Sequence, residues 1–116
     1  MSNGPVLITG GAGFIGSNLA DAAIARGREC HVVDNLHNGR RENVPSEAHF
    51  HQIDIRDAED LAAVVGESGA ETIFHLAAQA DVRVAVDRPT FDADVNVLGT
   101  VAVLEAAREH GCAVLF

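Results

Sequence analysis

The residues best suited to chemistry are four glycines that lie within seven positions near the start of the chain, in the stretch TGGAGFIG. Gly11, Gly13 and Gly16 have the spacing G-x-G-x-x-G, and Gly10 forms an overlapping set with the last two. An apolar run precedes the stretch and a helical run follows it, so backbone N–H groups would face an anion at a helix N-terminus. Gly10 would permit the tight turn, Gly13 the approach of a pyrophosphate, and Gly16 close helix packing. The spacing predicts a dinucleotide site, whereas a nucleoside-triphosphate loop would need a Lys, which the chain lacks.

An acidic residue stands where such a site would contact the adenosine ribose. Asp34 ends the second apolar run, 18 residues beyond Gly16. Its carboxylate could accept hydrogen bonds from the ribose hydroxyls of NAD and would repel the additional phosphate of NADP. Arg40 and Arg41 follow and could in principle hold that phosphate, but we interpret them as solvated loop charges. The expected cofactor is therefore NAD rather than NADP.

Histidines and cysteines are the remaining candidates for a metal site. His49 and His51 alternate on one face of a predicted strand, a spacing that could hold a metal, but no third ligand is evident. We interpret them as a half-exposed strand pair, and His75 as a buried histidine with satisfied hydrogen bonds. Cys30 and Cys112 each begin an apolar run and are expected to be small core residues. No metal site is predicted.

The elements that position these residues alternate between short apolar runs and helical patterns. Strands joined by helices of this length make βαβ units, and hence an α/β, Rossmann-type, doubly wound parallel sheet of five strands in the order 3-2-1-4-5. The cofactor is expected along the carboxyl ends of the strands. The expected strands are 5–9, 30–34, 49–54, 72–76 and 112–116; the expected helices are 14–26, one that begins after Asp57, and 90–110, with Phe91, Val95, Leu98, Val101 and Leu104 along one face.

Composition excludes several classes of partner. The net charge of −9 leaves no basic surface for nucleic acid, and all eight basic residues are Arg. The apolar runs are too short to span a membrane, and the first residues do not have the pattern of a signal peptide. We expect one NAD-binding Rossmann domain over residues 1–116, in the cytoplasm.

Four blocks of the sequence resemble the extended short-chain dehydrogenase/reductase family, and within it the nucleotide-sugar epimerases and dehydratases. The blocks are ITGGAGFIGSNLAD, VVDNLHNG, FHQIDIRD, and the long stretch from IFHLAAQADVRVAVDRP to DVNVLGTVAVLEAAREHG. The segment HLAAQADVRVAVDRP is most similar to UDP-glucose 4-epimerase-like members. The resemblance covers essentially the whole chain.

The resemblance implies a role for each residue that matches the family's motifs. It implies small residues under the nicotinamide ribose, because the backbone approaches the cofactor closely there. The implied contact residues are Gly10, Gly13, Phe14, Ile15 and Gly16 at the pyrophosphate; Asp34, Asn35, Leu36, Asn38 and Gly39 around the adenosine ribose; Asp54 and Ile55 at adenine; Leu76, Ala77, Ala78 and Gln79 under the nicotinamide ribose; and Asn96 near the nicotinamide end.

The residues that perform catalysis in that family are missing from this sequence. Family members use a Tyr-x-x-x-Lys pair, whose tyrosinate accepts the hydroxyl proton of the sugar while NAD takes the hydride. The chain has no Tyr and no Lys, and it ends within a predicted strand. We therefore expect the N-terminal portion of a UDP-sugar enzyme, without turnover of its own and with a possible homodimer partner. The alternative is a free-standing, non-catalytic NAD-binding module.

Overall fold

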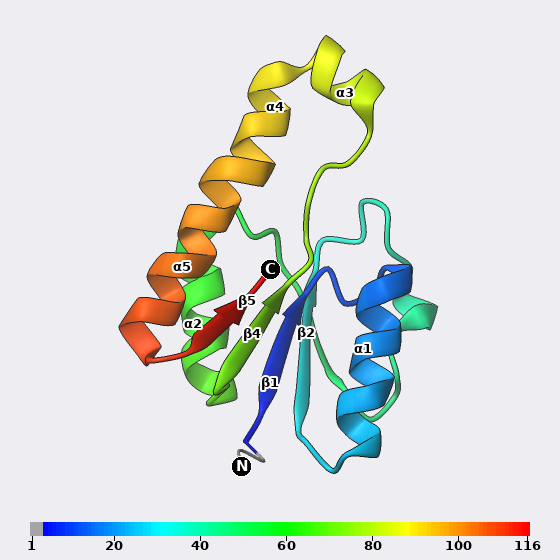
Figure 1. Ribbon diagram of the computed structural model, residues 1–116, viewed down its shortest axis with the longest axis vertical. Helices are drawn as coiled ribbons and strands as arrows, with labels where there is room; N and C mark the ends of the chain where they lie inside the picture. The colour runs from blue at the N-terminus through cyan, green and yellow to red at the C-terminus, as the bar shows by residue number, and fades with distance from the viewer. Residues whose placement is uncertain (1–3) are drawn as a thin grey trace.

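A five-stranded parallel sheet forms the centre of the computed structural model, which describes residues 4–116. The strands lie in the order β3-β2-β1-β4-β5, which confirms the predicted fold class and strand order (Figure 1). The strands are β1 (Val6–Thr9), β2 (Cys30–Asp34), β3 (His49–Gln52), β4 (Thr72–His75) and β5 (Ala113–Leu115); the helices are α1 (Phe14–Ala25), α2 (Ala58–Ser68), α3 (Val82–Asp87), α4 (Pro89–Ala93) and α5 (Gly99–His110), with a 3₁₀ turn η1 (Arg41–Asn43) and a π-helical segment η2 (Asp94–Leu98).

Helices cover both faces of the sheet because the central strands are apolar on both sides. Val6 and Ile8 of β1 point toward α1, whereas Leu7 points toward α2 and α5. Figure 1 shows α1 on one side of the sheet and the pair α2 and α5 on the other. All four residues of β1 are fully buried, as expected for the central strand of a doubly wound sheet. No helix within residues 4–116 is long and apolar enough to cross a membrane.

The segment expected as one helix over 90–110 is a composite. It begins at Pro89 as α4, widens into the π-helical segment η2, and continues as α5 to His110. A short helix that the sequence analysis did not predict, α3, precedes it. A π-helical segment adds a residue to a turn and so changes which side chains face the sheet beyond it.

The predicted apolar face of this helix was wrong from Leu98, the last residue of η2, onward. Leu98 is 60% exposed, and Val101 and Leu104 are 45% and 42% exposed. The face that packs against α2 instead carries Val103, Ala106 and Ala107, while the buried Gly99 lies against Ile55. Alanines on this face suit the packing of α5 against α2, and the π-helical segment η2 changes which residues reach it.

Both cysteines are free thiols; Cys30 lies in the apolar core, as expected, and Cys112 packs against its edge. Cys30 is 1% exposed, and burial raises the pKa of its thiol to about 11. Cys112 is half-buried and donates a hydrogen bond from Sγ to the Ala70 carbonyl at 3.1 Å. Burial raises the pKa of this thiol too, so neither cysteine is a reactive thiolate.

Candidate functional site

Backbone atoms leave no room for a side chain at Gly10, in the loop after β1, or at Gly16, in the first turn of α1. Gly10 adopts φ +74°, and a Cβ there would lie 2.8 Å from the Ala77 backbone nitrogen. A Cβ on Gly16 would collide with the Gly10 carbonyl oxygen and approach the Gly11 Cα to 2.7 Å. Glycine is therefore required at these positions by contacts within the backbone.

Gly13 differs from those two glycines because it faces open space. A Cβ there would meet only the Gly10 carbonyl oxygen, at 3.4 Å. Gly13 is also the N-cap of α1, and no side chain caps this helix end or places an acidic group in its first turn. The first backbone N–H groups of α1 and the positive end of its dipole thus face the same opening as Gly13.

Asp34, at the end of β2, holds the glycine loop in place. Its Oδ2 accepts a hydrogen bond from the Ala12 N–H at 3.0 Å, and its Oδ1 accepts one from the Leu36 N–H at 2.8 Å. Arg40 N–H and Asn43 Nδ2 both donate to the Ala12 carbonyl, each at 3.1 Å. The loops after β1 and β2 are therefore tied together around one buried carboxylate, each of whose oxygens keeps a lone pair.

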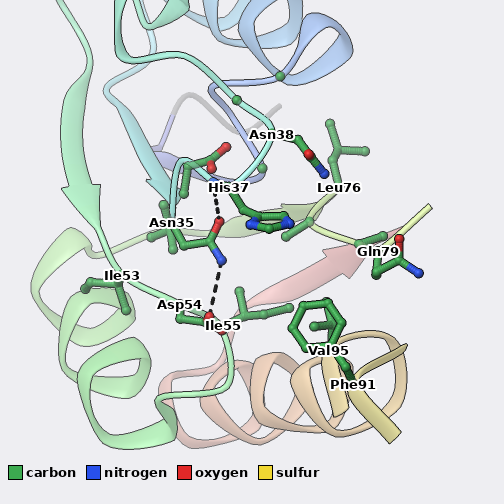
Figure 2. A pocket seen from close by; sticks show the side chains of 17 residues that line it. Asn35, His37, Asn38, Ile53, Asp54, Ile55, Leu76, Gln79, Phe91 and Val95 are labelled. Atoms are coloured by element: carbon green, nitrogen blue, oxygen red, sulfur yellow. Dashed lines mark hydrogen bonds between the residues drawn. The ribbon is translucent and has the colours of Figure 1, made fainter. Parts of the chain in front are cut away.

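A pocket opens at the carboxyl ends of β1, β2 and β4, and Figure 2 shows the side chains that line it. It brings together residues from all four of the sequence blocks that carry the family resemblance. The predicted site residues that line it are Gly10, Gly13, Asp34, Asn35, Asn38, Gly39, Asp54, Ile55, Leu76, Ala77, Ala78 and Gln79; the further lining residues are Val33, His37, Ile53, Phe91 and Val95.

Five predicted site residues do not line this pocket. Phe14 and Ile15 point outward and are 83% and 69% exposed, while Gly16 lies within the first turn of α1. Leu36 packs against the core on the α1 side of the sheet. The fifth, Asn96, has another role that its contacts define below.

The lining residues that the sequence analysis missed fall into two groups. Val33 and Ile53 each precede a predicted site aspartate at a strand end. That position could have indicated from the sequence that they line the pocket. Phe91 and Val95 were interpreted as ordinary core positions of a helix. His37 and Phe91 face each other with ring centroids 6.3 Å apart, although 54 positions separate them in the sequence. No local pattern could have indicated this contact.

Asp54 carries a carboxylate whose acceptor positions are already filled. Arg56 donates to Oδ1 from its backbone N–H at 2.9 Å and from Nε at 3.0 Å, and to Oδ2 from Nη2 at 2.7 Å. Asn35 Nδ2 donates to Oδ2 at 3.2 Å, which Figure 2 shows. The Arg56 guanidinium is the main reason that the pKa of Asp54 falls to about 2. Asp54 is therefore an anionic acceptor at neutral pH.

A chain of hydrogen bonds runs beneath the pocket from β1 to α5. The Thr100 hydroxyl donates to the Asn96 carbonyl at 2.8 Å, so it accepts from Nε2–H of His75 at 2.9 Å. Nδ1 of His75 then accepts from the Thr9 hydroxyl at 2.7 Å, and Thr9 Oγ1 accepts the N–H of Leu76. The network requires a neutral His75, and burial lowers the pKa of this imidazole accordingly. His75 is thus the satisfied buried histidine that we expected.

Asn96 fixes the loop that follows β4. Its Oδ1 accepts a hydrogen bond from the Gln79 N–H at 2.7 Å, and its Nδ2 donates to the Gln79 carbonyl at 2.9 Å. The same Nδ2 also donates to Asp92 Oδ1 at 3.2 Å. Asn96 lies in the π-helical segment η2, and its amide is occupied by the loop backbone. It therefore acts on the pocket as a positioning residue through Gln79.

The buried His75 predicts a stability that falls in mild acid. Its pKa is lowered in the folded state, so near pH 6 the unfolded chain binds more protons and the free energy of unfolding decreases as pH falls below about 6.5. Burial lowers the pKa of His31 and His51 in the same direction. Urea unfolding at pH 7.5 and 5.5 would measure this decrease. His75→Gln should be less stable than the wild type at pH 7.5 and show a smaller decrease; an equal decrease would contradict a role for His75.

Residues 6–116 match the model of the NAD dependent epimerase/dehydratase family. The chain belongs to this family. Within the epimerase/dehydratase family, the UDP-glucose 4-epimerase of Mycolicibacterium smegmatis is 49% identical over 110 residues, which cover 90% of this chain and 35% of that protein.

Solved structures of epimerases share the fold closely. The Thermus thermophilus UDP-glucose 4-epimerase, in complex with NAD, superposes with a TM-score of 0.92 at 45% identity and covers 97% of this chain. The Thermotoga maritima UDP-glucose 4-epimerase, solved with UDP-glucose, gives a TM-score of 0.90 at 41% identity over 93% of this chain. The chain spans about one third of the length of these proteins, namely 36% and 35%.

Proposed function

We propose that this chain binds NAD in the pocket of Figure 2 and is the cofactor-binding part of a nucleotide-sugar epimerase or dehydratase that acts on a UDP-sugar. The observation that carries the proposal is the junction of the glycine loop with Asp34. The uncapped start of α1 and a buried carboxylate face one pocket, and both belong to elements at the carboxyl ends of the strands. This is the place where open α/β sheets bind their ligands.

The described side chains suit the separate parts of NAD. The start of α1 beside Gly13 would hold the pyrophosphate, and the free lone pairs of Asp34 would accept the ribose hydroxyls. The adenine amine would need to displace Asn35 from Asp54, because the four acceptor positions of Asp54 are filled. The small residues Ala77 and Ala78 leave room for the nicotinamide ribose. When bound, NAD would supply a hydride acceptor.

The preference for NAD over NADP is the sharpest test of this assignment. We expect NAD to bind more tightly than NADP, since Arg40 is paired with Glu42 at 3.9 Å and the Arg41 guanidinium lies 4.5 Å from the Phe50 ring centroid. Asp34→Ala should weaken the binding of NAD by about tenfold or more, which is the contribution of one charge-assisted hydrogen bond. The difference in affinity between NAD and NADP should become smaller. Calorimetric titration of the wild type and the variant with NAD and with NADP would measure these affinities.

The control for this experiment is Arg40→Ala, which should leave the preference for NAD unchanged. Because Asp34 also anchors Ala12 and Leu36, amide NMR spectra should accompany the Asp34 variant and show that the fold is retained. Equal or tighter binding of NADP by the wild-type chain would contradict the role of Asp34 and indicate that the arginines dominate.

A homodimer remains a prediction, and it depends on uncovered apolar surface of the long helix. The surface available for it is the outer face of η2 and α5, where Val97, Leu98, Val101 and Leu104 are between 42% and 60% exposed. Contiguous exposed apolar side chains of this kind are typical of protein interfaces.

A further inference from the structure

Three histidines and a glutamate form a cluster on β2 and β3, away from the proposed cofactor pocket. Parallel pairing places His31 beside His49 and Val33 beside His51, so the three imidazoles share one face of the sheet. Glu29 lies two positions before His31 and joins this group just ahead of β2. None of the four residues lines the pocket, which begins at Val33 and continues to the carboxyl ends of the strands.

The ligand atoms of this cluster already have the spacing of a metal coordination shell. Glu29 Oε1 lies 3.2 Å from His31 Nε2 and 3.3 Å from His49 Nε2. Zinc bonds of about 2.0–2.1 Å to nitrogen and oxygen in tetrahedral geometry separate neighbouring ligand atoms by about 3.3–3.4 Å. One ligand atom from each of Glu29, His31 and His49 lies within 4.8 Å of the others.

His51 supplies the partner that a metal-binding histidine usually has. His31 Nδ1 and His51 Nε2 lie 3.1 Å apart, so a proton on Nδ1 can be donated to His51. That tautomer leaves Nε2 of His31, the nitrogen nearest Glu29, with a free lone pair. Metal-ligating histidines commonly use their second ring nitrogen in this way, which fixes the ring and the tautomer.

The cluster contains one buried ligand, His31, and two solvent-accessible ones, Glu29 and His49. The His31 side chain is 10% exposed, whereas those of Glu29 and His49 are 51% and 56% exposed. The His31 and His49 rings are stacked, with centroids 4.6 Å apart and planes 21° from parallel. His49 would leave this stacking to turn its Nε2 toward an ion, while His31 is held by the sheet and by His51.

We propose that Glu29, His31 and His49 bind a divalent transition metal of the zinc class, with His51 orienting His31. Two imidazoles and one carboxylate are a ligand set that such ions prefer. A solvent molecule would occupy the fourth position on the exposed side. The bound ion would tie the edge strand β3 to β2. This inference revises the expectation that His49 binds no metal. His51 stays outside the ligand set, and the other two ligands come from the neighbouring strand and the turn that precedes it.

Titration of the metal-free protein with Zn²⁺ by calorimetry, and with Co²⁺ by visible absorption, tests the proposal. We expect one ion per chain and a Co²⁺ spectrum of low coordination number. Glu29→Gln and His49→Gln remove exposed ligands, so the fold should survive, and each should weaken binding by about tenfold or more. His51→Gln leaves the ligands in place and should still weaken binding by about 10–100-fold.

The matched control is His110→Gln, because His110 is an exposed histidine outside the cluster at the end of α5. It should bind Zn²⁺ as the wild type does. Imidazole NMR signals of His31 and His49 should shift on titration, and those of His110 should not. The proposal is overturned if the wild type binds no Zn²⁺, or if it binds Zn²⁺ no more tightly than the Glu29→Gln and His49→Gln variants do.

Discussion

Gly16→Ala is expected to abolish measurable NAD binding and to destabilise the protein by about 1–3 kcal/mol. The new Cβ would collide with the Gly10 carbonyl and approach the Gly11 Cα to 2.7 Å. Both are backbone atoms, so the whole loop would have to move, and strain from overpacking typically costs this much. The loop has little freedom to move, because Gly10 is itself pressed against Ala77 and Ala12 is held by Asp34.

The measurements are urea unfolding and calorimetric titration with NAD, and Gly66→Ala provides the matched control. A Cβ on Gly66 would meet only the ring of His110, the far end of a flexible side chain. Gly66 lies inside α2, where replacing glycine with alanine favours the helix by about 0.5–1 kcal/mol. The control should bind NAD normally and be at least as stable as the wild type. A Gly16→Ala variant that binds NAD as tightly as the wild type would refute the proposed role of the loop.

The second large effect that we expect is an absence of turnover by the 116-residue chain. The sequence has no Tyr and no Lys, so a tyrosinate that removes the hydroxyl proton of a sugar cannot form. Loss of such a general base typically costs about 10²–10⁴-fold in rate. The chain also spans only about one third of its relatives, so positioning of the sugar by the remaining part would be lost, a contribution that reaches several kcal/mol.

An assay with UDP-glucose or UDP-galactose and NAD on the purified chain would measure this. The Mycolicibacterium smegmatis enzyme, assayed at equal concentration, is the positive control because it is 49% identical over the shared region. We expect no epimerase, dehydratase or dehydrogenase product above the background without protein. Turnover at an ordinary enzymatic rate would show that residues within this chain perform the chemistry.

The sequence by itself determined the fold and the kind of site. Apolar runs of strand length alternate with helical patterns, which indicates βαβ units. Because the crossovers of such units are nearly always right-handed, few sheet topologies are possible, and the strand order could be predicted. The glycine spacing was equally informative, because the close approaches at Gly10 and Gly16 occur between segments near in the sequence or directly paired in the sheet. Asp34 was predictable because it ends a strand beside the glycine loop.

The tertiary structure alone decided what depends on distant contacts. The π-helical segment η2 changed which residues of α5 meet α2, so periodicity gave the wrong apolar face. The Asn96 amide forms hydrogen bonds with the Gln79 backbone, and Phe91 lines the pocket. Likewise, strand register placed His31 and Glu29 beside His49. A local pattern specifies each element, but the contacts between elements follow from register and close packing, which no single segment encodes.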